Sequence, residues 1–253
     1  MAETGDDLRH DSRMTLSSPP PQIPIRVFMT RQHPCGYYPE RLARNLVLDP
    51  SSPYLASAYA SAIDHGFRRS GAQVYRPHCQ SCDACMATRI DVAAFVPDRS
   101  QRRALARNTD LEMRLAPPVR TPENYELYSK YLASRHGDGP MAESDPDDFL
   151  SFLTSDWSRT VFMELRREGK LVAVAVTDLL PQGISAVYTF YDTSEPKRSL
   201  GTVCILRQIE LAYRRQLPWL YLGYWLEGHP KMDYKRRYSA MQVLRDSQWQ
   251  PMT

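Results

Sequence analysis

The chain has 253 residues, of which 42% are hydrophobic and 24% charged, and its formal net charge at pH 7 is +3. This length allows one large domain or two closely packed smaller ones, and the hydrophobic content is ordinary for a globular protein. No apolar run approaches the about 20 residues that a membrane helix needs. The polar opening MAETGDDLRHDSR lacks the apolar stretch of a secretory signal. We therefore expect a cytoplasmic protein that does not enter a membrane.

The first half of the chain mixes helical and extended patterns. Residues 1–24 are polar and proline-rich, and they predict a disordered arm. Beyond the arm, a capping serine followed by proline and an alanine-rich run predict a helix over 52–62, and an arginine-rich helical pattern predicts another over 98–108. Alternating apolar positions predict strands over 73–75, 88–92 and 111–115, with a cysteine-containing loop between the first two.

A second half begins after the Pro117-Pro118 pair, which ends the last of these strands. Its patterns predict helices over 121–135, 145–154 and 201–215 and strands over 160–165, 171–179, 184–191 and 219–222. We therefore expect a mixed α/β (α+β) protein. Its N-terminal domain would span residues 25–116 and its C-terminal domain residues 117–253.

Charge is unevenly distributed along this second half. Residues 197–245 contain ten basic and three acidic side chains, a net charge of +7, whereas residues 138–156 are acidic. A concentrated positive charge is typical of a phosphate-binding face. The alternative is that these side chains belong to solvated helix faces.

Several short motifs occur in a fixed order. The C-terminal half contains SAVYTFYD at 185–192, RSLGT at 198–202, YLGYW at 221–225 and PKMDYK at 230–235. The N-terminal half contains PCGYY at 34–38 and YRPHC at 75–79, followed by Cys82 and Cys85. Together they resemble the arginyl/leucyl-tRNA–protein transferase family, in particular its bacterial leucyl branch, over roughly residues 25–250.

The resemblance implies a GNAT-like acyltransferase fold, with the cysteine-containing N-terminal half packed on a C-terminal GNAT-like half. It implies an aminoacyltransferase that moves leucine from Leu-tRNA to the N-terminal α-amine of proteins beginning with Asp or Glu, in the N-end rule degradation pathway. The partners would be Leu-tRNA and such proteins, without DNA and without a membrane. No cofactor is required for this reaction.

Three alternatives remain open at this point. The donor could be arginine, the chain could be a non-catalytic RNA-binding module, or it could be an ordinary GNAT enzyme that uses acetyl-CoA. Such GNAT enzymes carry a glycine-rich turn that cradles pyrophosphate at a helix N-terminus. Residues 198–202 do not provide that turn.

The chemistry is aminolysis of an activated ester, for which positioning supplies most of the acceleration. Asp192, at the end of a predicted strand, is the acid expected nearest the reacting amine, with Tyr191 beside it as the second catalytic candidate. The alternative is an aspartate that caps a turn or a helix. Arg198, Ser199 and the amides around Gly201 are expected to bind the terminal phosphate or the ester oxygen.

Aromatic and basic side chains near the C-terminus are candidates for contact with the RNA. Tyr224 and Trp225 are expected to stack on the unpaired CCA end, the alternative being strand core. Lys231 and Lys235 are four residues apart and would share one face of a helix. The expected phosphate patch consists of Lys231, Lys235, Arg236 and Arg237, and Tyr234 is a further candidate for contact with the tRNA.

The cysteines form a distinctive set. Cys79, Cys82 and Cys85 share one loop, and Cys35 belongs to the other half of the same motif pair, so we expect all four to lie close together. Four thiolates suit zinc or an iron–sulfur cluster. In the arginyl branch of the resembling family, a second cysteine stands where this sequence has Tyr38. We therefore expect free thiols and no metal.

An acidic acceptor requires a cation that meets its carboxylate. The candidates for the acceptor site come from their position around the N-terminal motifs alone. They are Cys35, Tyr38, Arg41 and Arg76, with Arg44 as a further cation.

Overall fold

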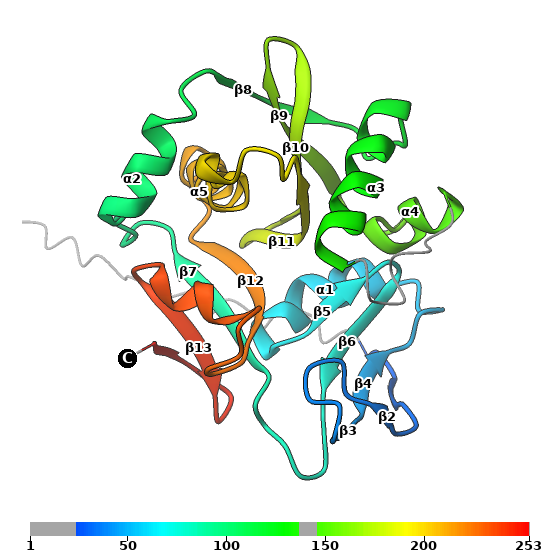
Figure 1. The fold of residues 1–253 in the computed structure, drawn as a ribbon. Coiled ribbons are helices and arrows are strands. Elements are labelled where there is room, and N and C mark those ends of the chain that lie inside the picture. The colour runs from blue at the N-terminus through cyan, green and yellow to red at the C-terminus, as the bar shows by residue number, and fades with distance from the viewer. Residues whose placement is uncertain (1–23, 137–145, 253) are drawn as a thin grey trace, which may run out of the picture.

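The computed structural model describes residues 24–136 and 146–252 (Figure 1). The arm predicted for residues 1–24 thus lies outside the described residues, apart from its last position. None of the described helices is long and apolar enough to cross a membrane.

An eight-stranded sheet forms the centre of the molecule. Its order is β14-β13-β7-β12-β11-β10-β9-β8, and every neighbouring pair is antiparallel except β11 and β12. Strands from both sides of residue 117 share this sheet, and the division into two domains there stays a prediction. The strands are β7 Met86–Asp91, β8 Leu111–Ala116, β9 Thr160–Arg167, β10 Lys170–Leu180, β11 Gly183–Tyr191, β12 Trp219–Trp225, β13 Met241–Arg245 and β14 Gln248–Pro251.

A second, four-stranded sheet has the order β1-β4-β6-β5. A buried apolar core that includes Tyr59, Val74 and Tyr221 joins this sheet to β12 of the large sheet. The strands are β1 Val27–Met29, β4 Asn45–Leu48, β5 Arg68–Ser70 and β6 Gln73–Pro77, with β2 His33–Pro34 and β3 Leu42–Ala43 forming a separate pair.

Helices cover both faces of the large sheet (Figure 1). Ala173 and Ala175 of β10 belong to the buried cluster of α5 and α2, whereas Val174 and Val176 belong to that of α3 and α4. Alternate residues of β10 therefore face opposite helix layers, as the two-residue period of a strand requires. The helices are α1 Leu55–Ala62, α2 Arg99–Ala106, α3 Pro122–His136, α4 Pro146–Leu153 and α5 Leu200–Arg214, with 3₁₀ turns η1 Ile63–His65, η2 Pro196–Arg198 and η3 Asp233–Arg237.

The mixed α/β class is confirmed, and the predicted helices and strands are present with ends shifted by a few residues. The first helix begins at Leu55 rather than at Ser52, because the Ser52 hydroxyl accepts a hydrogen bond from the Tyr54 amide (3.3 Å) and forms the turn before the helix. At the start of α2, Asp98 and Gln101 form a reciprocal capping box.

The prediction of a helix face shared by Lys231 and Lys235 is wrong. Only a 3₁₀ turn forms here, and it begins at Asp233. Lys231 is exposed, whereas Lys235 is buried with 4% of its surface accessible. Lys235 is therefore not part of a surface patch of phosphate-binding lysines.

Candidate active site

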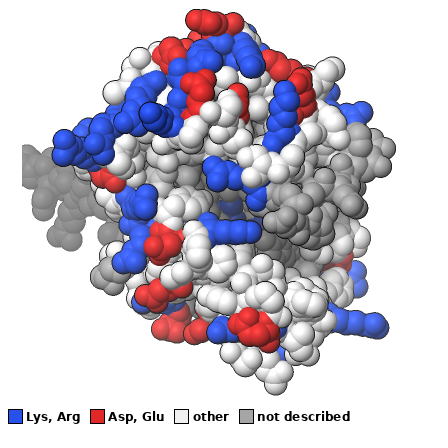
Figure 2. All heavy atoms as spheres, viewed as in Figure 1, with Lys and Arg blue, Asp and Glu red and all other residues white. Residues whose placement is uncertain are grey.

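The two parallel strands of the large sheet separate from each other. β11 and β12 pair only at Gly183–Trp219, Ile184–Leu220 and Ser185–Tyr221, after which β11 continues to Tyr191 and β12 to Trp225 without pairing each other. Strands that part in this way leave backbone N–H and C=O groups facing an opening, where they can bind a ligand. Figure 2 shows that the middle of this face is hollowed, with Lys and Arg side chains in the hollow.

Arg68, from β5 of the small sheet, lies where the strands separate. Its Nη2 donates a hydrogen bond to the Ala186 carbonyl of β11 (2.6 Å). On the other side it lies against Gly223 of β12, where an added Cβ would be 3.6 Å from Arg68 Nε. The side chain is only 7% exposed, and its Nη1 has no hydrogen-bond partner among the described residues. Arg68 was not among the residues predicted from the sequence.

Lys235 is a second buried cation at this opening. Its Nζ donates hydrogen bonds to the Tyr224 carbonyl and to the Met232 sulfur. Burial, together with the nearby positive charge of Arg68, lowers the Lys235 pKa to about 7. In the described part of the chain, neither Lys235 nor Arg68 forms an ion pair with a carboxylate.

Several aromatic rings lie near these cations. Tyr75 and Tyr224 have ring centroids 6.1 Å apart, and Tyr131 and Tyr191 have centroids 5.0 Å apart. Tyr234 is 43% exposed, and the centroid of its ring lies 5.8 Å from Lys235 Nζ. A mostly aromatic lining with a few placed charges is typical of a ligand-binding site.

The two predicted stacking residues are both buried. Tyr224 is 6% exposed and donates its hydroxyl to the carbonyls of Gly66 (2.9 Å) and Tyr75 (3.3 Å). Trp225 is 4% exposed. Their ring faces are therefore packed in the core, and Tyr234 is the exposed ring of this group.

The predicted donor-binding residues lie at the start of α5. An added Cβ on Gly201 would be 3.1 Å from Tyr191 Cε1, so the helix approaches this ring closely. Ser199 is the N-cap residue, with a φ of 56° and no side-chain capping bond. Arg198 pairs with Asp110 (2.9 Å) and with Glu195 (2.9 Å). These two carboxylates occupy its guanidinium.

Asp192 sits in the turn that follows β11. Its Oδ1 accepts a hydrogen bond from the Ser194 amide (2.9 Å), and the hydrogen bonds from Ser194 hold the Asp192 pKa below its usual range. Lys170 and Lys130 lower it further. Asp192 is thus an anion that could hold an ammonium group, and a weaker proton acceptor than a free carboxylate.

Replacing Asp192 with Asn tests these two roles. An amide oxygen can still accept the bond from Ser194, so the turn and the melting temperature should be preserved. If the carboxylate holds the acceptor amine, turnover should fall on the order of 10-fold, with unchanged affinity for tRNA. Steady-state kinetics and a thermal melt check both. Normal turnover with a lowered melting temperature would leave Asp192 only its role in the turn.

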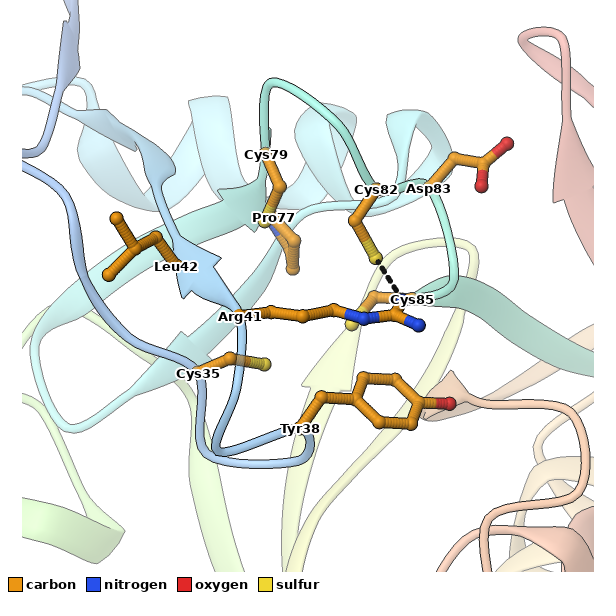
Figure 3. Close-up of a pocket in the computed structure, with 9 residues that line it drawn as sticks. All are labelled: Cys35, Tyr38, Arg41, Leu42, Pro77, Cys79, Cys82, Asp83 and Cys85. Carbon is orange, nitrogen blue, oxygen red and sulfur yellow. Dashed lines mark hydrogen bonds between the residues drawn. The ribbon is translucent and has the colours of Figure 1, made fainter.

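The four motif cysteines line a single pocket (Figure 3), as expected from the spacing of the three loop cysteines and from the motif that contains Cys35. Burial and the neighbouring thiols Cys35, Cys79 and Cys82 raise the pKa of Cys85 to about 12. Arg41 lies among them, and its Nη1 donates a hydrogen bond to Cys82 Sγ (3.3 Å).

The thiol pocket is not arranged as a metal site in this structure. Thiolates suit zinc or iron, but the guanidinium of Arg41 lies among the sulfurs and would repel a metal cation. Within the described ranges, no group of His, Cys, Asp and Glu side chains is placed to hold a metal ion.

Two of the predicted acceptor cations, Arg41 and Arg76, are already engaged, whereas the Nε of Arg44 has no hydrogen-bond partner among the described residues. Arg41 also stacks over the Tyr38 ring at 4.3 Å. Arg76 donates to the His65 carbonyl (2.8 Å) and lies 5.1 Å from the centroid of the Phe67 ring. The cavity among the thiols is small, with a volume of about 40 Å³.

Comparison with known proteins identifies both halves of the chain. The model of "Arginine-tRNA-protein transferase, N terminus" matches residues 33–103, and that of "Arginine-tRNA-protein transferase, C terminus" matches residues 123–245. The aspartate/glutamate leucyltransferase of Stenotrophomonas maltophilia (strain K279a) is 50% identical over 231 residues, which cover 89% of this chain and 92% of that protein. The protein of the same name from Xylella fastidiosa (strain 9a5c) is 48% identical over 239 residues, covering 92% and 94%.

Solved structures offer only a distant likeness. A GCN5-related glucosamine N-acetyltransferase region of a fungal multi-domain β-N-acetylglucosaminidase matches with a TM-score of 0.41 and 10% identity. The match covers 76% of this chain and 22% of that chain. This similarity is too low to assign the fold.

Proposed function

This chain belongs to the arginine-tRNA-protein transferase family, and from that premise we propose that it transfers leucine from Leu-tRNA to the N-terminal α-amine of proteins that begin with Asp or Glu. It is an aminoacyltransferase rather than the non-catalytic RNA-binding module considered from the sequence. Its relatives support leucine over arginine as the donor, since both are named aspartate/glutamate leucyltransferases. The reaction would take place in the cytoplasm and mark its product for N-end rule degradation.

The observation that carries the proposal is the opening between β11 and β12, which contains buried cations and aromatic rings. The antiparallel sheet with one diverging parallel pair, and α5 starting beside the end of β11, support a GNAT-like acyltransferase fold. In such a fold the ester would lie along the free edge of β11, near the N-terminal amides of α5, which can stabilise a developing oxyanion.

The chemistry follows from this placement. The acceptor amine attacks the ester carbonyl, so that a C–N bond forms and the C–O bond to the terminal ribose breaks. The proton lost by the amine is transferred to the departing ribose oxygen or to solvent. An α-amine has a pKa of about 7.7–8.0 and is partly deprotonated near neutral pH, so holding the two substrates together supplies most of the acceleration.

The body of the tRNA requires a basic surface outside this opening. Helix α2 packs on α5 through a shared buried cluster, and Gln101 Nε2 donates to the Arg237 carbonyl (3.1 Å), which brings η3 beside it. Figure 2 shows Lys and Arg side chains gathered over α2. We place the tRNA backbone on this α2 surface, defined by Arg99, Arg102, Arg103, Arg107, Arg236 and Arg237, which are all exposed.

A transfer assay tests the proposed function directly. The protein is incubated with Leu-tRNA or Arg-tRNA and with peptides that begin with Asp, Glu, Arg or Ala, and the products are weighed by mass spectrometry. We expect one added leucine on the Asp and Glu peptides only. Addition of arginine would reverse the donor assignment. Leucine on the Arg-started peptide would overturn the acceptor assignment.

A further inference from the structure

Arg68 and Lys235 form a pair of buried cations without a counter-ion. Both are more than nine-tenths buried, and Arg68 Nη1 is aimed at no partner among the described residues. Burying an unpaired charge is costly, and structures normally offset it with an opposite charge. Here Arg68 is held by Ala186, and Lys235 by Tyr224, through backbone carbonyls, which are neutral. Arg68 therefore lacks a balancing negative charge, which we expect a ligand to supply. An anion bound there would also raise the pKa of Lys235 and keep its side chain protonated.

The chemistry of the pair selects the kind of anion. A guanidinium donates two parallel hydrogen bonds to a planar carboxylate, and an ammonium adds a point charge beside it. The ester of the donor is neutral in its ground state and could not balance the charge of Arg68. Backbone phosphates of tRNA would meet the exposed arginines of α2 before a site as deeply buried as this one.

We infer that Arg68 and Lys235 form the acceptor subsite and bind the side-chain carboxylate of the acceptor's first residue. This inference rests on the proposed function. In Asp and Glu this carboxylate and the reacting α-amine belong to the same residue. Binding the carboxylate between β11 and β12 therefore holds the amine in the same opening as the ester. Arg41 and Arg76, predicted for this role from the sequence, have other partners.

Lys235→Met tests the inference through acceptor selectivity. Methionine keeps much of the volume of the buried side chain and removes its charge. We expect kcat/KM for an Asp-started peptide to fall on the order of 10- to 100-fold, as a charged hydrogen bond is lost. The matched Asn-started peptide should be affected little, and so should the KM for Leu-tRNA. Lys235→Arg, which keeps the charge, should retain the preference for Asp over Asn.

Arg114→Met is the control for loss of a cation. Arg114 is exposed on β8, the edge strand of the large sheet, and pairs with Glu112 (3.0 Å). Its replacement should leave unchanged the ratio of kcat/KM for the Asp-started peptide to kcat/KM for the Asn-started peptide. An equal fall in kcat/KM for both peptides in Lys235→Met would overturn the inference, because it would give the lysine a structural role. A fall in tRNA affinity alone would also overturn it, because it would give the lysine a role in binding the donor.

Binding of labelled peptides to the wild-type protein, without tRNA, separates this inference from the proposed function. We expect the Asp-started peptide to bind more tightly than its Asn counterpart, by fluorescence anisotropy. Equal binding of the two peptides would overturn the inference even if no variant folds. If the wild type transfers no leucine but still prefers the Asp peptide, the proposed reaction is wrong while the anion subsite stands.

Discussion

Replacing Asp178 with Ala should lower the free energy of unfolding by about 3–5 kcal/mol, the cost of leaving a buried charge without its partner. Asp178 and Arg69 both have fully buried side chains, and Asp178 accepts from Arg69 Nε (2.6 Å) and Nη2 (2.6 Å). The hydroxyls of Thr160 (2.8 Å) and Tyr59 (3.2 Å) complete its shell. This network connects β5 of the small sheet with β10 of the large sheet, so its loss should weaken the packing of one sheet against the other.

Urea unfolding followed by circular dichroism measures the effect. Arg69→Met combined with Asp178→Leu removes both charges, and should recover much of the stability that the single variant loses. A loss below about 1 kcal/mol in Asp178→Ala would contradict the assigned role. Two separate unfolding transitions in the variant would show that the two halves can fold as units, which is the division predicted at residues 116–117.

Local patterns in the sequence predicted the longer elements because those patterns act over a few residues. The Ser-Pro start before α1 and the alternation in β7 are examples. Most strands of the small sheet were not predicted, because they are short and pair with distant segments, as β1 does with β4. The β13–β14 hairpin also went unpredicted, although Asp246 and Ser247 both adopt positive φ in its turn. Asp-Ser is a weaker turn signal than Asn-Gly.

For the candidate site, too, local patterns predicted only what lies close together in the sequence. The spacing of Cys79, Cys82 and Cys85 placed three thiols in one loop, and the structure confirms that Cys35 joins them. The position of Arg68 depends on contact with Ala186, which is 118 residues away in the chain. No local pattern reports such a contact.

Lys235 illustrates why a charge in the sequence cannot be assigned to the surface. Its neighbours Lys231 and Arg236 are exposed, as the basic composition of the segment suggests. The 3₁₀ turn at Asp233–Arg237 directs Lys235 inward instead, onto the Tyr224 carbonyl at the end of β12. The family motif PKMDYK therefore contains one lysine for solvent and one for the interior.

The separation of roles between α2 and the opening makes a prediction about tRNA. Changing Arg99, Arg102 and Arg103 together to Gln should weaken Leu-tRNA binding about 100-fold near physiological salt, and should make the slope of log affinity against log salt shallower by about 2–3. All three side chains are exposed, and none of them forms an ion pair with a carboxylate in the described ranges. Gln has a helix propensity close to that of Arg, so α2 and the melting temperature should be unaffected.

A variant with the same net charge provides the control for this triple change. Arg26, Arg114 and Arg214 are exposed arginines outside α2, and changing all three to Gln should alter tRNA affinity much less. Equal weakening in the two triple variants would show that only the overall charge matters, and that α2 is not the tRNA surface. An unchanged salt slope in the α2 variant would likewise exclude α2 as that surface. Loss of tRNA affinity confined to the α2 variant, with peptide binding preserved, would show that donor and acceptor are held by separate sets of cations.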